Sequence, residues 1–175
     1  MDTPSELVAT AVGRHAPILP QVEQLYVDAF PAAERVPFKR LVQSPLNGYT
    51  DKLWVFTRND EFCGFMTTIT RADLTLVGYF AMMPALRGQG NGSAALQLMR
   101  GMMPQQRIAL EIEVLDPQAA NYSERVRRRD FYIRNGYRMT SIQYRTYGVP
   151  FVVMVNGADI SAEEYHQFYD PLVKS

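Results

Sequence analysis

The sequence is poor in the side chains that cross-link a chain or bind transition metals. It has one cysteine, Cys63, and two histidines among its 175 residues. A lone cysteine excludes an intrachain disulfide and a cysteine-based metal site, and it fits a reducing compartment. His15 and His166 lie far apart and in no motif, which argues against a histidine metal site. Cys63 stands in a strand-like run, where we expect a buried apolar side chain rather than a nucleophile.

The sequence also lacks an excess of charge of one sign and a long hydrophobic run. Lysine and arginine together number 18, as do aspartate and glutamate, so no overall field favours nucleic acid or membrane as a partner. No apolar run approaches the ~18 residues that a membrane-spanning helix needs, and the first residues lack the basic and apolar regions of a signal peptide. We therefore expect a cytoplasmic protein that binds neither nucleic acid nor membrane.

Apolar residues are abundant enough for one substantial core. With 47% hydrophobic and 21% charged residues, the chain resembles an ordinary globular protein, and its length favours a single domain over residues 1–175. Periodicity predicts, in order, a strand at 7–12, helices at 17–30 and 33–43, strands at 53–58, 62–70 and 74–82, a helix that ends before Pro104, a strand at 108–115, a helix at 122–135, a strand hairpin at 137–147 and 149–155, and a last helix at 161–169. Ser161, followed three residues later by Glu164, predicts a capping box at the start of that helix. This order predicts an α/β (α+β) fold with a mixed, mostly antiparallel central sheet and helices on both faces.

The most informative segment is Arg87-Gly-Gln-Gly-Asn-Gly-Ser93, which stands between a strand-like run and a helix-like run. Three glycines in such a turn let the backbone approach a ligand and point several amides at one anion. The segment lacks the Gly-Lys-Ser/Thr of a Walker A loop, and the spacing of Gly88, Gly90 and Gly92 does not match the dinucleotide fingerprint. The residues alone leave two alternatives, which are a flexible turn and a site for a phosphorylated cofactor.

The wider window, residues 80–93, reads Phe-Ala-Met-Met-Pro-Ala-Leu-Arg-Gly-Gln-Gly-Asn-Gly-Ser. It closely resembles the acetyl-CoA-binding motif of the Gcn5-related N-acetyltransferase (GNAT) family. That motif is a strand, a proline and then Gln/Arg-x-x-Gly-x-Gly/Ala opening a helix, and its fixed positions are met by Arg87, Gly90 and Gly92. A second segment, Phe131-Tyr-Ile-Arg-Asn-Gly-Tyr137, resembles the Tyr-x-x-x-Gly-aromatic segment at the end of the family's next helix. The resemblance is strongest over residues 74–138 and implies a GNAT-like fold.

The resemblance implies acetyl-CoA as a co-substrate and no metal. Backbone amides and a helix N-terminus suit its pyrophosphate, to which Arg87 would add a charge-assisted contact and Ser93 a hydroxyl. In the family, the strand before the loop pairs through its backbone with the pantetheine arm. The cofactor-binding residues that follow from the resemblance are Phe80, Ala81, Met82, Arg87, Gly88, Gln89, Gly90, Gly92 and Ser93.

Attack by an amine on a thioester needs a base for the amine proton, and the leaving thiolate profits from an acid. Tyr132 matches the family's general-acid tyrosine, and a phenol with a pKa of about 10 stays protonated at pH 7. Glu111 and Glu113 alternate with apolar residues on one predicted strand and therefore share a face. Mutual repulsion and burial would raise the pKa of at least one of them, as a base requires. The alternative is that both carboxylates pair with the arginine-rich helix that follows.

Glu34 is a second candidate for the base, because its segment borders the acceptor site in the family. It reads equally well as the solvated start of a helix. The predicted helix that carries Tyr132 departs from the family's Asn-x-x-Ala pattern and instead has a group of arginines, namely Arg125, Arg127, Arg128 and Arg129. The loss of the asparagine removes one usual contact to the pantetheine arm. The arginines have three possible destinations, which are a CoA phosphate, the carboxylates of the preceding strand, and solvent.

These features together predict an N-acetyltransferase that moves an acetyl group from acetyl-CoA to a primary amine by direct attack, since no nucleophile for an acyl-enzyme is indicated. The alternative is a non-catalytic CoA-binding regulatory module of the same fold. The acceptor is expected to be a small-molecule or peptide amine. Tyr144, Tyr147 and Phe151 are candidates to line its pocket, although core packing explains them as well. Pairing through the last strands would produce a homodimer.

Overall fold

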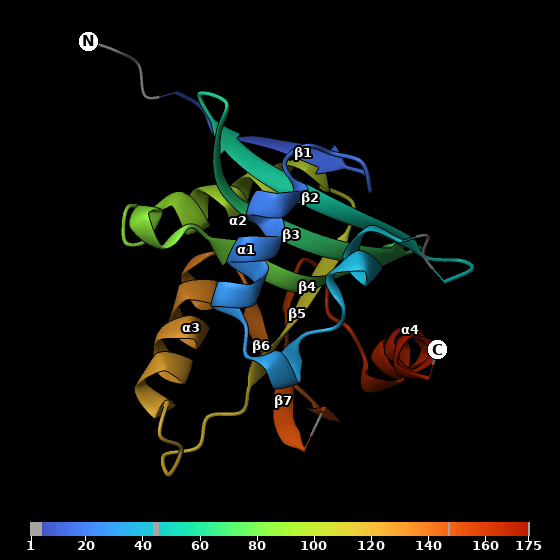
Figure 1. Cartoon of the computed structure of the whole chain (residues 1–175). Coiled ribbons are helices and arrows are strands. Elements are labelled where there is room, and N and C mark those ends of the chain that lie inside the picture. The colour runs from blue at the N-terminus through green and yellow to red at the C-terminus, as the bar shows by residue number, and fades with distance from the viewer. Residues whose placement is uncertain (1–4, 44–45, 147, 175) are drawn as a thin grey trace. The chain divides into compact units, whose positions relative to one another are not determined.

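A computed structural model describes residues 5–43, 46–146 and 148–174. Its strands form a mixed sheet in the order β1-β2-β3-β4-β5-β7-β6, which confirms the predicted fold class. The elements, with η for a 3-10 helix, are β1 (Val8–Val12), α1 (Leu19–Ala29), η1 (Ala32–Glu34), η2 (Phe38–Val42), β2 (Thr50–Arg58), β3 (Glu61–Arg71), β4 (Leu74–Met82), η3 (Pro84–Leu86), α2 (Asn91–Met102), β5 (Arg107–Glu113), α3 (Tyr122–Arg134), β6 (Arg138–Thr146), β7 (Val149–Asn156) and α4 (Ala162–Val173) (Figure 1).

The chain divides into two compact units. The first comprises Met1–Ile69 and Val77–Pro104, and the second comprises Thr70–Leu76 and Gln105–Ser175. Strands β3 and β4 contribute residues to both units. The expectation of one domain over the whole chain stays a prediction.

In the first unit, β1 pairs antiparallel with β2, from Val8↔Thr57 to Val12↔Leu53. Strands β2 and β3 are joined by Asn59 and Asp60, which both have positive φ, at 51° and 61°. Two left-handed residues between strands make the tight turn of a β-hairpin, so the hairpin predicted from the sequence is present. Figure 1 shows α1 lying across the strands of this unit.

Helix α1 buries its apolar stripe on one face of these strands. Its Val22, Leu25 and Tyr26 pack with Leu53, Val55 and Phe65 of the strands. The alternate residues of β2 point to the opposite face, where Arg58 hydrogen-bonds Asn91 at the start of α2. Within this unit, helices therefore cover both faces of the sheet.

The predicted helix over 33–43 is wrong as one continuous element. The structure has η1 and η2 there, separated by an extended stretch in which Arg35 has ψ of 135° and Pro37 has ψ of 130°. The cause is Pro37, which has no amide hydrogen and disfavours helical backbone at the residue before it. Two short turns replace one helix, and the stretch between them carries Arg35.

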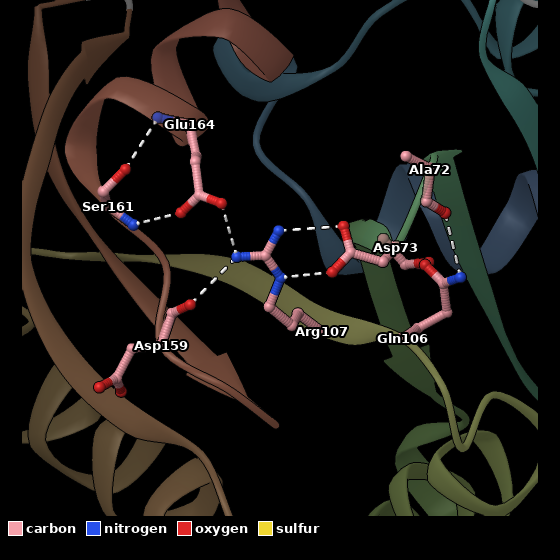
Figure 2. A network of polar contacts seen from close by, with 8 residues as sticks. Ala72, Asp73, Gln106, Arg107, Asp159, Ser161 and Glu164 are labelled. Carbon is pink, nitrogen blue, oxygen red and sulfur yellow. Dashed lines mark hydrogen bonds and ion pairs between the residues drawn. The ribbon is translucent and has the colours of Figure 1, made fainter.

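In the second unit, β5 pairs antiparallel with β7, and β7 pairs antiparallel with β6, as the predicted hairpin requires. Figure 2 shows how Arg107, at the start of β5, ties three segments together. Its guanidinium contacts Asp73 with Nε 2.9 Å from Oδ2, donates to the Asp159 carbonyl at 3.0 Å, and lies 3.0 Å from Glu164 Oε1. Glu164 closes the predicted capping box, with its amide donating to Ser161 Oγ at 3.1 Å and its carboxylate accepting from the Ser161 amide at 2.8 Å.

Two further properties concern only the described ranges. None of their helices combines the length and the apolar composition that crossing a membrane would require. No three of their histidine, cysteine, aspartate and glutamate side chains gather in the way that a metal ion would require.

Candidate active site

The glycine loop adopts a backbone that only glycine favours. Gly88 has φ of +73° and Gly90 has φ of +78°, and a Cβ added to either would meet nothing within 4 Å. The left-handed conformation, rather than crowding, therefore selects glycine at both positions. Helix α2 begins immediately afterwards, at Asn91. The amides of Asn91 and Gly92 belong to its first turn and have no partner inside the helix, which suits an anionic ligand.

Asn91 holds this loop in place, a role that the sequence analysis missed. Its side chain is buried, donates from Nδ2 to the Leu86 carbonyl at 3.0 Å, and accepts from Arg58 Nη1 at 2.6 Å. Gln89 also turns back on the loop, since its Nε2 donates to the Ala85 carbonyl at 3.1 Å. A short polar side chain between two glycines at a helix start was the available signal, because asparagine readily hydrogen-bonds nearby backbone.

Arg87 is exposed, and its guanidinium has no hydrogen-bond or ion-pair partner among the described residues. A charged ligand at the loop would supply that partner. The residues expected beside the pantetheine arm lie at the end of β4. The parallel ladder between β4 and β5 has three pairs, Leu74↔Arg107 to Leu76↔Ala109, so Phe80, Ala81 and Met82 lie beyond it. Ala81 and Met82 are buried, and the Phe80 ring packs on Phe56 with centroids 6.2 Å apart.

Tyr132 lies near the C-terminal end of α3. Its ring packs against Phe131 and Tyr137 at centroid distances of 5.2 and 5.6 Å. Burial raises the pKa of its phenol to about 12, while the positive charge of Arg128 acts in the opposite direction. Within the described part of the chain its hydroxyl has no hydrogen-bond partner. Tyr132 therefore keeps its proton at neutral pH and has it available to donate.

The structure separates the two glutamates of β5. Glu113 is ion-paired, with Oε2 2.7 Å from Arg125 Nη2 and Oε1 3.2 Å from Arg128 Nη1. Asn121 donates to Oε2 as well, at 3.4 Å. Pairing with the arginine-rich helix, one of the two alternatives for these carboxylates, is therefore what the structure shows for Glu113.

Glu111 has a different environment. The one hydrogen bond described for its carboxylate comes from Tyr165, whose hydroxyl donates to Oε1 at 2.5 Å. Burial raises the pKa of Glu111, and the hydrogen bond from Tyr165 partly offsets that rise. Tyr165 is fully buried, so this bond is shielded from water. A carboxylate whose charged form is disfavoured and which lacks a cationic partner has the character of a general base.

The arginines of α3 have mostly found protein partners. Arg125 also donates to Asn121 Oδ1 and to the Val114 carbonyl, each at 2.8 Å. Arg129 pairs with Asp130 at 2.8 Å, and Arg127 is exposed. Of the three predicted destinations, Arg125 and Arg128 reach the carboxylate of the preceding strand.

The remaining candidate residues from the sequence each have a different environment. Glu34 uses its carbonyl to accept from Tyr79 at 2.7 Å, and its carboxylate has no described partner. Tyr144 hydrogen-bonds His166 Nδ1 at 2.6 Å and Asp170, and its ring packs on Tyr165 and Tyr169. This packing favours the core interpretation of Tyr144. Phe151 is half-buried in β7, and Tyr147 lies outside the described residues.

Solved structures of similar fold cover nearly the whole chain. A putative acetyltransferase of the GNAT family from Bacteroides thetaiotaomicron matches 94% of this chain and 95% of its own, with a TM-score of 0.77 and 22% identity. The ribosomal-protein-S18-alanine N-acetyltransferase of Escherichia coli matches 90% and 97%, with a TM-score of 0.61 and 19% identity. A GNAT family acetyltransferase from Elizabethkingia anophelis, solved with acetyl-CoA bound, matches 87% and 99%, with a TM-score of 0.59 and 12% identity. At these identities the likeness shows the fold alone. No curated protein matches the sequence significantly.

The family comparison is decisive, because it covers more than half of the chain. The profile of the acetyltransferase (GNAT) family matches residues 19–136, a range that includes α1, the glycine loop, both glutamates of β5 and Tyr132. The predictions of an acyltransferase and of acetyl-CoA as its co-substrate are thereby confirmed. The chain belongs to the GNAT family of acetyltransferases.

Proposed function

We propose that this acetyltransferase transfers the acetyl group of acetyl-CoA directly to a primary amine, with Glu111 as general base and Tyr132 as general acid. The observation that carries the proposal is the Tyr132 hydroxyl, which is unpaired in the described chain and protonated at neutral pH because burial raises its pKa to about 12. Tyr132 also occupies the tyrosine position of the segment that resembles the family's Tyr-x-x-x-Gly-aromatic segment, and that tyrosine is the general acid in the family.

In the proposed reaction, Glu111 removes a proton from the ammonium group of the acceptor. The resulting amine attacks the thioester carbon, the new C–N bond forms, and the C–S bond breaks. Tyr132 gives its proton to the departing thiolate and is reprotonated from solvent. The nitrogen loses its second proton to solvent as the C–S bond breaks. It has then lost two protons and the sulfur has gained one, so one proton is released overall. Glu113 is excluded from the role of base in this scheme because both of its oxygens are held by arginines.

The loop from Arg87 to Ser93 is proposed to bind the pyrophosphate of acetyl-CoA. Gly90 supplies the test, because its φ of +78° strains any other residue. Gly90→Ala should weaken CoA binding, measured by calorimetry. Gly101→Ala is the matched control, since Gly101 lies in α2, an added Cβ would meet nothing within 4 Å, and the position does not need a left-handed backbone. If the two variants bind CoA with equal affinity, the loop is not part of the CoA-binding site.

Catalysis is tested by release of CoA thiol with a broad panel of primary amines. Tyr132→Phe should lower kcat by roughly 10²- to 10⁴-fold, the usual contribution of one acid–base group. Tyr122→Phe, in the first turn of the same helix, serves as the control. If wild-type protein binds CoA but turns over no amine of the panel, the regulatory module is the better interpretation. If Tyr132→Phe retains full kcat, Tyr132 is not the acid.

A cytoplasmic location and a homodimer are retained as part of the proposal. The single cysteine, which fits a reducing compartment, supports the location. Light scattering on the purified chain measures the oligomeric state.

A further inference from the structure

A small pocket in the first unit lies between α1 and residues 32–38. Its volume is about 310 Å³, and its walls include Glu23, Val27, Arg35 and Phe38. This volume is at the low end of the ~300–1,000 Å³ range of ligand pockets. The pocket therefore suits a compact small molecule.

Arg35 brings an uncompensated positive charge to this pocket. Its Nε is buried without a hydrogen-bond acceptor, and no described residue forms an ion pair with its guanidinium. Buried polar groups nearly always have hydrogen-bond partners, and Arg35 as a whole is half-buried, so its guanidinium is accessible to a ligand. A ligand carboxylate can accept two parallel hydrogen bonds from a guanidinium, and it is therefore the group that best supplies the missing acceptor and counter-charge of Arg35.

The backbone on both sides of Arg35 is fixed from outside its own segment. Tyr26 of α1 donates to the Val36 carbonyl at 2.8 Å, and Tyr79 of β4 donates to the Glu34 carbonyl at 2.7 Å. The Val36 amide donates in turn to the Tyr79 hydroxyl at 3.3 Å. The backbone that carries Arg35 is thus held before a ligand arrives, and a fixed backbone lowers part of the entropic cost of binding.

The same tyrosine connects the pocket to the strand proposed to run along acetyl-CoA. Tyr79 immediately precedes Phe80, the first of the three β4 residues assigned to the cofactor. The pocket is therefore bonded to the part of β4 that carries this assignment, which makes it a candidate for the acceptor's position.

Glu23 restricts the class of ligand further. Its carboxylate lines the same pocket and has no described partner, and it does not pair with Arg35. A ligand with negative charge only would be repelled by Glu23, and a ligand with positive charge only would be repelled by Arg35. A molecule that carries one carboxylate and one ammonium has no net charge and avoids both repulsions.

We propose that the acceptor is a small amino-carboxylate, such as an amino acid, whose carboxylate is bound by Arg35. The inference rests on the proposed acetyl transfer to a primary amine. It disfavours polyamines and aminoglycosides, which are polycations without a carboxylate.

The experiment compares matched acceptors that differ only in the carboxylate: glycine with glycinamide and β-alanine with β-alaninamide, extended to further amino acids and their amides. Binding is measured by calorimetry and turnover by CoA thiol release. The wild-type protein should prefer each acid over its amide. Arg35→Gln should raise the Kd or KM of the acids by roughly 10-fold or more, as expected for loss of a charge-assisted hydrogen bond, and leave the amides unchanged. Arg40→Gln, at an exposed arginine of η2, is the control.

The outcomes separate this inference from the proposed function. If acids bind in an Arg35-dependent manner but are not acetylated while other amines are, the acceptor is not an amino-carboxylate and the inference fails. If no amine of any class is acetylated, the proposed function fails. If amides or polyamines bind or react as well as acids with the wild-type protein, the inference is overturned, whatever the variants do. Should Arg35→Gln fail to fold by circular dichroism, Arg35→Lys tests the same point, because it keeps the charge and loses the planar fork.

Discussion

The two glutamates of β5 should respond in opposite ways to the same substitution. Glu113→Gln removes the counter-charge of Arg125, whose side chain is 14% exposed against 11% for Glu113. Breaking a buried pair from one side costs about 3–5 kcal/mol. Arg125 keeps its bonds to Asn121 and the Val114 carbonyl, which places the expected loss near the lower end. At roughly 2–4 °C per kcal/mol for a chain of this size, Tm should fall by about 6–12 °C.

Glu111→Gln should leave stability at pH 7 unchanged or raise it. The amide oxygen can still accept from Tyr165, and the substitution removes a charge that burial disfavours. Because the pKa of Glu111 is raised in the folded state, the folded protein binds a proton there more tightly than the unfolded chain does. Wild-type stability from this group is therefore present at low pH and is lost as pH rises through the raised pKa. The stability of Glu111→Gln should lack this dependence on pH.

The assay is urea unfolding followed by circular dichroism at pH 7 and at pH 4, with thermal melts alongside. The Glu113→Gln deficit should be large at pH 7. The Glu111→Gln variant should gain relative to wild type as pH rises from 4 to 7. Equal losses for the two variants, or a larger loss for Glu111→Gln, would refute the assignment of one glutamate to an ion-pair network and the other to an unpaired site.

Three further substitutions test the site and its frame. Asn91→Ala should destabilise the protein by about 1–3 kcal/mol, because it leaves the half-buried Arg58 and the Leu86 carbonyl without this partner. It should also weaken CoA binding in calorimetry, unlike Gln97→Ala on the exposed side of α2. Tyr165→Phe removes the hydrogen bond that lowers the pKa of Glu111, so the acid limb of the pH profile of kcat/KM should move to higher pH. If that limb does not move, Glu111 is not the group that titrates in it. Arg107→Met should cost about 1–2 kcal/mol at pH 7, since its partners are mostly exposed, and the deficit should shrink in acid as Glu164 becomes protonated. A deficit independent of pH would mean that packing, not charge, makes Arg107 important.

Local signals predicted most of the fold. The Asn59-Asp60 hairpin and the capping box of Ser161 and Glu164 depend on a few adjacent residues, and the structure has both. The helix predicted over 33–43 is wrong as one element, although Pro37 stands in the sequence as a break inside it. Proline acts on the backbone conformation of the preceding residue, which periodicity does not register.

The site was less predictable, because partner choice depends on residues far apart in sequence. Alternation placed Glu111 and Glu113 on one face, but only the folded chain shows that one reaches the arginines of α3 and the other reaches Tyr165 of α4. Arg35 carried no sequence signal at all, since an arginine in a connecting segment is ordinarily solvated. The backbone position of Arg35 depends on the hydroxyls of Tyr26 in α1 and Tyr79 in β4, which donate hydrogen bonds to the neighbouring carbonyls.

These two hydroxyls also make the segment around Arg35 suitable for protein engineering. The hydrogen bonds that set its path use the carbonyls of Glu34 and Val36 and the amide of Val36, and therefore do not depend on which side chain occupies position 35. A saturation library at this position would vary the chemistry of the pocket on a constant backbone. Selection from such a library with acceptors of different charge would yield acetyltransferases of altered specificity without redesign of the fold.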